Sequence, residues 1–154
     1  MEQADEKSLV ILHFNDVYSI DEAPTEPVGG IARFKTALHS FLYLDPLILF
    51  SGDLYSPSTL TSVTKGEHMV KPIHDFKVDV ACVGNHDYDI GLEMLTKFVE
   101  ESQFPWLLTN VHDPETNKPL GGGKEYHIIE KKGFKIGDTL EIEGSLEKVK
   151  IVGF

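Results

Sequence analysis

The chain has 154 residues, of which 41% are hydrophobic and 25% are charged. This length and balance are typical of one globular domain, and they exclude a disordered or fibrous protein. The formal net charge is −11, from 25 acidic and 14 basic residues, so we do not expect a nucleic-acid-binding protein that works by neutralising phosphates.

Predicted strands and helices alternate over the first 110 residues. Short apolar runs predict buried strands at residues 8–14, 47–50, 78–83 and 105–108. Apolar residues at helical spacing predict one helix that starts at Ile31 and stops near Asp45-Pro46, and another at residues 92–99. A weaker helical stretch at residues 59–76 contains Gly66 and Pro72, which we expect to break it.

The last part of the chain has a different pattern. Residues 112–124 are rich in glycine and proline and predict a long loop or the tip of a hairpin. Apolar and polar residues alternate from residue 126 to residue 154, which predicts two or three strands, with turns at Lys132-Gly133, Gly137-Asp138 and Gly144-Ser145. The whole sequence therefore predicts an α/β fold with a mainly parallel sheet, covered on both faces or forming one layer of a sandwich.

Targeting and membrane signals are missing from the sequence as given. The first seven residues are acidic and lack the apolar core of a signal peptide, so we expect a flexible N-terminus. No apolar run approaches the roughly 18 residues of a membrane span. We therefore expect a cytoplasmic protein without a membrane partner. The single cysteine, Cys82, excludes an internal disulfide and a thiolate-rich metal site.

Polar residues follow three successive predicted strands, at Asn15-Asp16, Gly52-Asp53 and residues 84–87 (Gly-Asn-His-Asp). One such aspartate is more often a turn or capping residue, but three at matched spacing predict a shared site at the carboxyl edge of a parallel sheet. Carboxylates placed so close together repel one another unless a cation binds them. Gly52 and Gly84 fit this picture, because a sharp turn and a close approach favour glycine.

These segments resemble the calcineurin-like metallophosphoesterases, in particular the branch of the 5′-nucleotidases and 2′,3′-cyclic phosphodiesterases. The resemblance rests on residues 12–16, 51–58 and 84–89, with further likeness at residues 29–33 and 108–111. It implies that the chain is part of a four-layer αββα sandwich with a strand-rich C-terminal segment. Residues 1–154 would then be the N-terminal half of a catalytic domain.

The resemblance also implies a role for each matching residue. Asp16 would bind a first metal ion, Asp53 would bridge two ions, and Asn85 would bind the second ion and the phosphate. His86 would contact the phosphate, stabilise the transition state and protonate the leaving oxygen, while Asp89 would orient His86. The implied cofactors are two divalent ions (Mn, Zn or Fe), and the implied reaction is hydrolysis of nucleotides or related phosphate esters by metal-activated water.

Two features depart from the family pattern. Tyr18 stands where the family has a histidine, so either its phenol is a weak or indirect ligand or the first metal site lacks a ligand. The later Gly-His and Gly-His-x-His blocks are absent from the sequence. We therefore expect a fragment with little activity of its own. The alternative is a non-catalytic remnant that binds one metal weakly or serves as a protein-interaction module.

The remaining histidines are not expected to complete the metal site. They are His13, His39, His68, His74, His112 and His127. His13 is expected to point to the face opposite Asp16, because successive side chains alternate along a strand. His39, His68 and His74 are expected on the surface of helices. The sequence assigns no oligomeric state.

Overall fold

The protein is described by a computed structural model that covers residues 8–137, 142–143 and 149–152, with side chains placed in the first of these ranges. The expected flexible segment at residues 1–7, and the turns expected at Gly137-Asp138 and Gly144-Ser145, involve residues outside this description.

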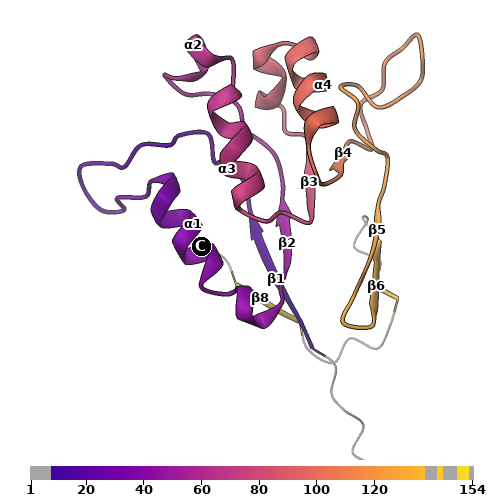
Figure 1. The fold of residues 1–154 in the computed structure, drawn as a ribbon. Coiled ribbons are helices and arrows are strands. Elements are labelled where there is room, and N and C mark those ends of the chain that lie inside the picture. The colour runs from indigo at the N-terminus through magenta and orange to yellow at the C-terminus, as the bar shows by residue number, and fades with distance from the viewer. Residues whose placement is uncertain (1–7, 138–141, 144–148, 153–154) are drawn as a thin grey trace, which may run out of the picture.

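The centre of the molecule is a parallel sheet (Figure 1). Its strands lie in the order β4-β3-β2-β1-β8, and each neighbouring pair is parallel. The bounds are β1 (Leu9–Phe14), β2 (Leu47–Phe50), β3 (Val80–Cys82), β4 (Trp106–Leu107) and β8 (Val149–Val152). The four strands predicted in the first 110 residues are confirmed as parallel neighbours, so their carboxyl ends lie at one edge of the sheet.

Helices cover one face of this sheet. They are α1 (Ile31–His39), α2 (Thr61–Thr64), α3 (Val70–Asp75) and α4 (Leu92–Glu101), with 3₁₀ turns at Leu42–Leu44, Glu67–Met69 and His86–Ile90. The helix expected to run from Ile31 to near Asp45-Pro46 ends earlier, at His39, and the 3₁₀ turn at Leu42–Leu44 follows it. Gly66 interrupts the second helical region at φ 85° as predicted, but Pro72 does not break α3. It lies in the first turn, where the missing N–H has no partner to lose.

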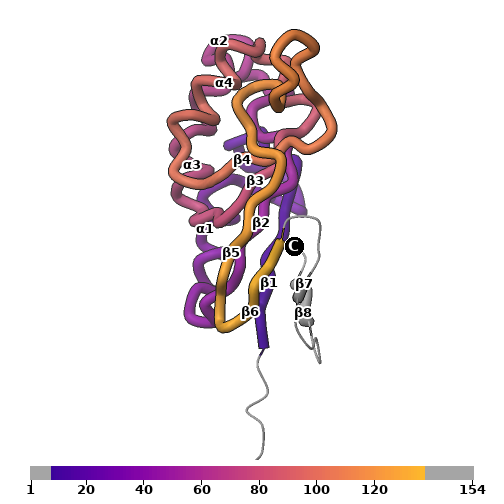
Figure 2. Tube along the Cα trace, turned by 90° about the vertical axis from the view of Figure 1, so that its right-hand side faces the viewer, coloured from indigo at the N-terminus to yellow at the C-terminus, as the bar shows by residue number. Residues whose placement is uncertain are grey.

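A second, antiparallel sheet lies against the other face. It contains β5 (Ile128–Lys131), β6 (Phe134–Gly137) and β7 (Ile142–Glu143) in that order. The predicted turn at Lys132-Gly133 joins β5 to β6, with φ 51° and 76° at the two positions, as a tight hairpin requires. Figures 1 and 2 show the helices on one side of β1 and β2 and the β5–β6 hairpin on the other. The α/β class is therefore confirmed, and the described residues form three layers, α, β and β.

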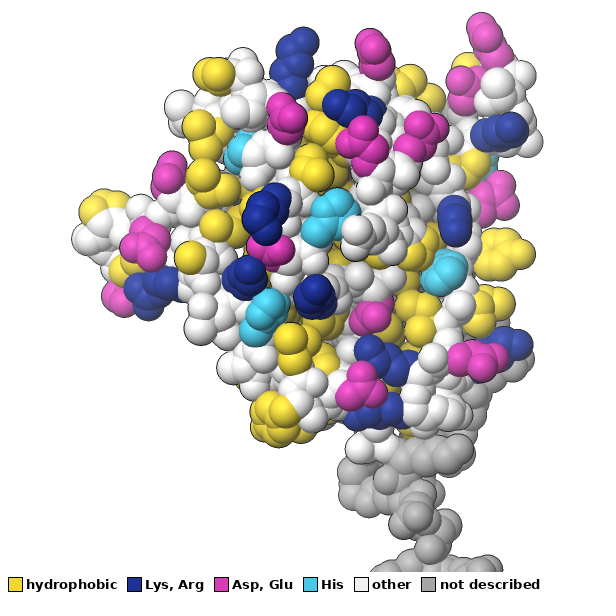
Figure 3. Space-filling view, viewed as in Figure 1, with side chains coloured by type: hydrophobic (Ala, Val, Ile, Leu, Met, Phe, Trp, Pro, Cys, Tyr) yellow, Lys and Arg dark blue, Asp and Glu magenta, His cyan; other side chains and the backbone are white. Residues whose placement is uncertain are grey.

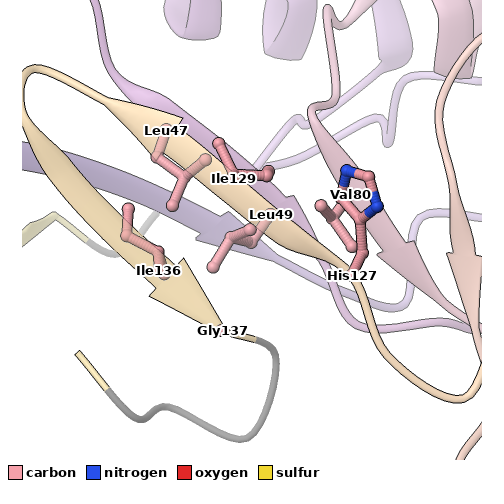
Figure 4. A pocket seen from close by; sticks show the side chains of 7 residues that line it. All are labelled: Leu47, Leu49, Val80, His127, Ile129, Ile136 and Gly137. Atoms are coloured by element: carbon pink, nitrogen blue, oxygen red, sulfur yellow. The ribbon is translucent and has the colours of Figure 1, made fainter. Parts of the chain in front are cut away.

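Side chains that alternate along β1 and β2 pack into two separate hydrophobic cores, one on each face of the sheet. Leu12, Ile48 and Phe50 pack under the helices in the larger core. Leu9, Ile11 and Leu47 face the hairpin and pack with Phe134, Ile129 and Ile136. Figure 4 shows a small apolar cavity left between Leu47 and Leu49 of β2 and the hairpin, with His127 at its border. β1 and β2 are thus packed on both faces, which explains their nearly continuous apolar sequences.

Two surface properties bear on possible partners. On the face shown in Figure 3, Lys and Arg side chains are interspersed with Asp and Glu and form no continuous basic area. Of the helices that the structure describes, none combines the length and apolar character needed to cross a lipid bilayer.

Candidate active site

The loops after β1 and β2 remain side by side beyond the ends of the strands. Ser51 donates its backbone N–H to Phe14 O (3.0 Å), and Asp16 donates its own to Gly52 O (3.1 Å). The sheet thus carries Asp16 and Asp53 to the same edge. Parallel pairing of β2 with β3 brings the residues after Cys82 to that edge as well.

Asp16 and Asp53 both adopt left-handed backbone conformations, with φ 57° and 62°. Aspartate tolerates this region better than most residues, and such conformations concentrate where a side chain must be aimed in one direction. Position 52 also requires glycine, because its backbone φ is 93°. Gly84 shows no such φ, and its requirement is steric: a Cβ there would lie 2.3 Å from Asp53 Oδ1. The two loops therefore pack backbone against backbone.

Asp87 joins these loops. It belongs to the motif at residues 84–87, but no role for it was predicted from the sequence. Its side chain is completely buried. The carboxylate accepts four backbone N–H groups, from Gly84 (2.8 Å), Asp53 (3.0 Å), Leu54 (2.7 Å) and Tyr55 (3.1 Å). Burial raises the pKa of the Asp87 carboxyl, and the four donors oppose that rise. Asp87 and Asp89 differ in burial: Asp87 is completely buried, whereas the side chain of Asp89 is 49% exposed.

His86 and Asp89 form a hydrogen-bonded pair at the surface of the site. His86 Nδ1 lies 2.9 Å from Asp89 Oδ2, and the side chains are 44% and 49% exposed. The hydrogen bond to Asp89 raises the pKa of His86, and the charges of Asp89, Asp53 and Asp16 add to the rise against a smaller desolvation effect. The same hydrogen bond lowers the pKa of Asp89, with a further contribution from Ser56. A protonated His86 is therefore favoured by three nearby carboxylates.

The backbone of His86 is also fixed to the second loop, because its N–H donates to Asp53 Oδ1 (2.8 Å). Asp16 receives a hydrogen bond from the side chain of Asn15. The structure thus brings together the loops that carry Asp16, Asp53, Asn85, His86 and Asp89, the five residues that the sequence singled out. The 3₁₀ turn at His86–Ile90, which no sequence pattern predicted, places Asp89 beside His86.

The donors at this edge fit part of a metal site. Asp16, Asp53 and Asn85 offer two carboxylates and an amide oxygen, which are ligands of the kind that divalent cations bind. Within residues 8–137, however, no three Asp, Glu, His or Cys side chains come close enough to form a metal-binding group. These residues would therefore contribute one portion of a metal site, and further ligands would be needed to complete it.

Tyr18 and the other histidines add no ligand group to this set. Tyr18 is half-buried, two residues beyond Asp16. His39, His68 and His74 are half-buried, which corrects the expectation that they lie exposed on helices. Each contacts another part of the protein instead. His39 is hydrogen-bonded to Asp75 O (2.7 Å), and His68 to Thr64 Oγ1 (2.7 Å). The His74 ring packs edge-on against the Phe104 ring, with 5.7 Å between the ring centroids.

Comparison with protein families gives a match to the calcineurin-like phosphoesterases over residues 9–150. Among curated proteins, the chain is 31% identical to a 5′-nucleotidase of Bos taurus, over 95% of this chain and 26% of that protein. It is 34% identical to a 5′-nucleotidase of Vibrio cholerae, over 94% of this chain and 28% of that protein. The chain therefore spans about a quarter of the length of these relatives.

Solved structures show the same fold. The 5′-nucleotidase precursor of Thermus thermophilus superposes with a TM-score of 0.67 at 24% identity, over 83% of this chain and 27% of that one. The NAD nucleotidase of Haemophilus influenzae superposes with a TM-score of 0.69 at 24% identity, over 83% of this chain and 25% of that one. These likenesses confirm the expected α/β fold, in which strands of a parallel sheet alternate with helices.

Proposed function

The chain belongs to the calcineurin-like phosphoesterase family, and from this premise we propose that it is the N-terminal half of the catalytic domain of a metal-dependent phosphoesterase. Its substrates would be nucleotides or related small phosphate esters. It would act in the cytoplasm and would bind neither nucleic acid nor a membrane. The similarity to 5′-nucleotidases supports the substrate class, and the net charge of −11 argues against nucleic acid.

One observation carries this proposal: the hydrogen-bonded pair His86–Asp89 lies at the edge where the loops of three parallel strands hold Asp16, Asp53 and Asn85. A histidine whose pKa is raised by a carboxylate partner, next to oxygen atoms that can bind metal ions, is suited to a reaction in which negative charge grows on phosphoryl oxygens. The His86–Asp89 pair is not required to hold the turn together, because Asp87 already supplies the hydrogen bonds that close it.

Each residue has a proposed task. Asp16, Asp53 and Asn85 would hold two divalent ions (Mn, Zn or Fe), which when bound supply Lewis-acid polarisation of the phosphate and a lowered pKa of water. Asn85 would also donate its amide N–H to a phosphoryl oxygen. His86 would donate a proton from Nε2 to the phosphate or the leaving oxygen, and Asp89 would keep Nδ1 of that ring protonated and aligned.

A non-catalytic remnant is the second candidate, and two observations favour it. Tyr18 stands in place of the usual histidine, and the described residues supply an incomplete ligand group. Such a chain would bind one metal weakly or serve as an interaction module. For the same reason, we expect the 154-residue chain by itself to show little or no turnover.

Hydrolysis of a chromogenic phosphate diester in the presence of Mn²⁺ separates the two candidates. The native full-length protein is compared with His86→Ala and Asp53→Asn, and with Asp113→Asn as a control, because Asp113 caps an exposed loop through Glu115 and Thr116. The phosphoesterase proposal requires native and control rates to agree and both site variants to lose at least roughly a hundredfold. Equal rates in all four proteins would contradict the site assignment, and no rate in any would favour the remnant.

A further inference from the structure

Among the residues whose side chains the structure describes, two polar or charged residues are buried, Asp87 and Ser56. Asp87 joins the two site loops through backbone groups. Ser56 is 5% exposed and lies three residues beyond Asp53, on the loop after β2. Its hydroxyl donates to Asp89 Oδ2 at 3.0 Å, across 33 positions of sequence. Both buried polar residues therefore connect the same two loops.

The Asp89 oxygen that Ser56 contacts is also the one that faces His86. Oδ2 lies 3.0 Å from Ser56 Oγ and 2.9 Å from His86 Nδ1. The side chains of Asp89 and His86 are each nearly half exposed. An exposed pair of this kind gains little energy by itself, because side-chain entropy and water compete with the contact. The hydrogen bond from the buried hydroxyl of Ser56 restricts the positions that the carboxylate can take.

We propose that Ser56 is a positioning residue of the active site, which fixes the Asp89 carboxylate and, through it, the ring of His86. With Oδ2 held in place, His86 donates Nδ1–H to Asp89, and Nε2 on the opposite side of the ring is left to face the phosphate. This inference rests on the proposed phosphoesterase function and adds to it a member of the His86–Asp89 arrangement that the family resemblance did not supply.

The test is a double-mutant cycle in the native full-length protein with Mn²⁺ and a phosphate diester. Ser56→Ala should lower kcat by roughly tenfold with little change in KM, because a misaligned ring affects the chemical step more than binding. In an Asp89→Asn background, Ser56→Ala should cause little further loss. The matched control is Ser58→Ala, whose hydroxyl contacts Thr61 (2.8 Å) and His68 (3.4 Å) and not Asp89; it should retain native kcat.

Two outcomes of this cycle overturn the proposal. The first is a native kcat in Ser56→Ala. The second is that Ser56→Ala lowers kcat by the same factor in the native protein and in Asp89→Asn, which would indicate general destabilisation. Ser56→Ala removes a single oxygen and should fold, and thermal unfolding checks that it does. Should it not fold, Ser56→Cys, which keeps the volume and donates weakly, replaces it under the same criteria.

A second measurement does not depend on activity. Ring ¹⁵N chemical shifts of neutral His86 report which nitrogen carries the proton. The native protein should show mainly the Nδ1–H form, and Ser56→Ala should shift the population towards Nε2–H, while Ser58→Ala should not. If the native protein hydrolyses no phosphate ester, the proposed function fails, and the change in tautomer population alone decides the role of Ser56. An unchanged population in Ser56→Ala would overturn it.

Discussion

The α-carbon of Gly84 lies directly against Asp53. A Cβ atom at position 84 would be 2.3 Å from Asp53 Oδ1 and 2.4 Å from the Asp53 backbone nitrogen. That nitrogen is itself held by Asp87 at 3.0 Å, so the loop cannot simply move aside. The position of the proposed bridging carboxylate thus depends on the absence of a side chain on a different loop, and this dependence can be measured.

Gly84→Ala should displace Asp53 and destabilise the chain by about 1–3 kcal/mol, the usual cost of forcing one methyl group into a packed site. The measurement is urea unfolding. Gly123→Ala is the control, because a Cβ there would meet Leu108 at 3.2 Å, a distance that small shifts can relieve. Equal unfolding free energies for native protein and Gly84→Ala would show that the two loops are not packed as described.

Asp87→Asn should lower the free energy of unfolding by about 3 kcal/mol, because an amide NH₂ would face backbone N–H donors that the carboxylate now satisfies. Asp113→Asn makes the same chemical change at an exposed turn with two backbone donors and should cost less than about 1 kcal/mol. Chemical unfolding compares the two variants, and similar losses would argue against a special role for Asp87.

The pKa of His86 should fall in Asp89→Asn. Hydrogen bonding to Asp89 raises the His86 pKa above its ordinary value of 6.5, so the stabilisation from this contact is complete below that value and is lost as the pH rises through the raised pKa. Asp89 has a lowered pKa, so its contribution is lost as the pH falls through that lowered value. NMR titration of the His86 ring, with chelator present, follows the midpoint.

The control for this titration is Asp75→Asn, because Asp75 pairs with Lys35 and Lys71 at 2.9 Å and does not contact the His86 ring. Its substitution should leave the His86 midpoint unchanged. A midpoint that moves equally in both variants would point to the net charge of the protein instead of the contact with Asp89.

Tyr18→His should strengthen Mn²⁺ binding several-fold, because imidazole is a better metal ligand than a neutral phenol. Isothermal titration with Mn²⁺ measures the affinity. Tyr43→His is a matched control: Tyr43 is 81% exposed in the 3₁₀ turn before β2, at the opposite end of that strand from Asp53. If neither substitution changes the affinity, position 18 does not face the metal site.

Much of the fold was predictable because it depends on local patterns. The apolar runs that become β1 and β2 are buried on both faces of the sheet, and Lys132-Gly133 provides the two positive φ values of a tight turn. Pro72 was misinterpreted because proline breaks a helix interior but not a first turn. Its effect depends on where the helix begins, and α3 begins only two residues before Pro72, at Val70.

The candidate site divides in the same way. Asp16, Asp53, Asn85 and His86 could be named from the sequence, because each follows a predicted strand and the spacing of strands and helices sets which edge of the sheet they share. Asp89 was named through the family resemblance. The sequence also determined the acidic charge and the family resemblance. The roles of Asp87 and Ser56 were decided by tertiary structure alone. The sequence does not show whether a given aspartate or serine is buried or exposed. Which donors and acceptors these side chains meet depends on how closely two loops more than 30 residues apart are packed.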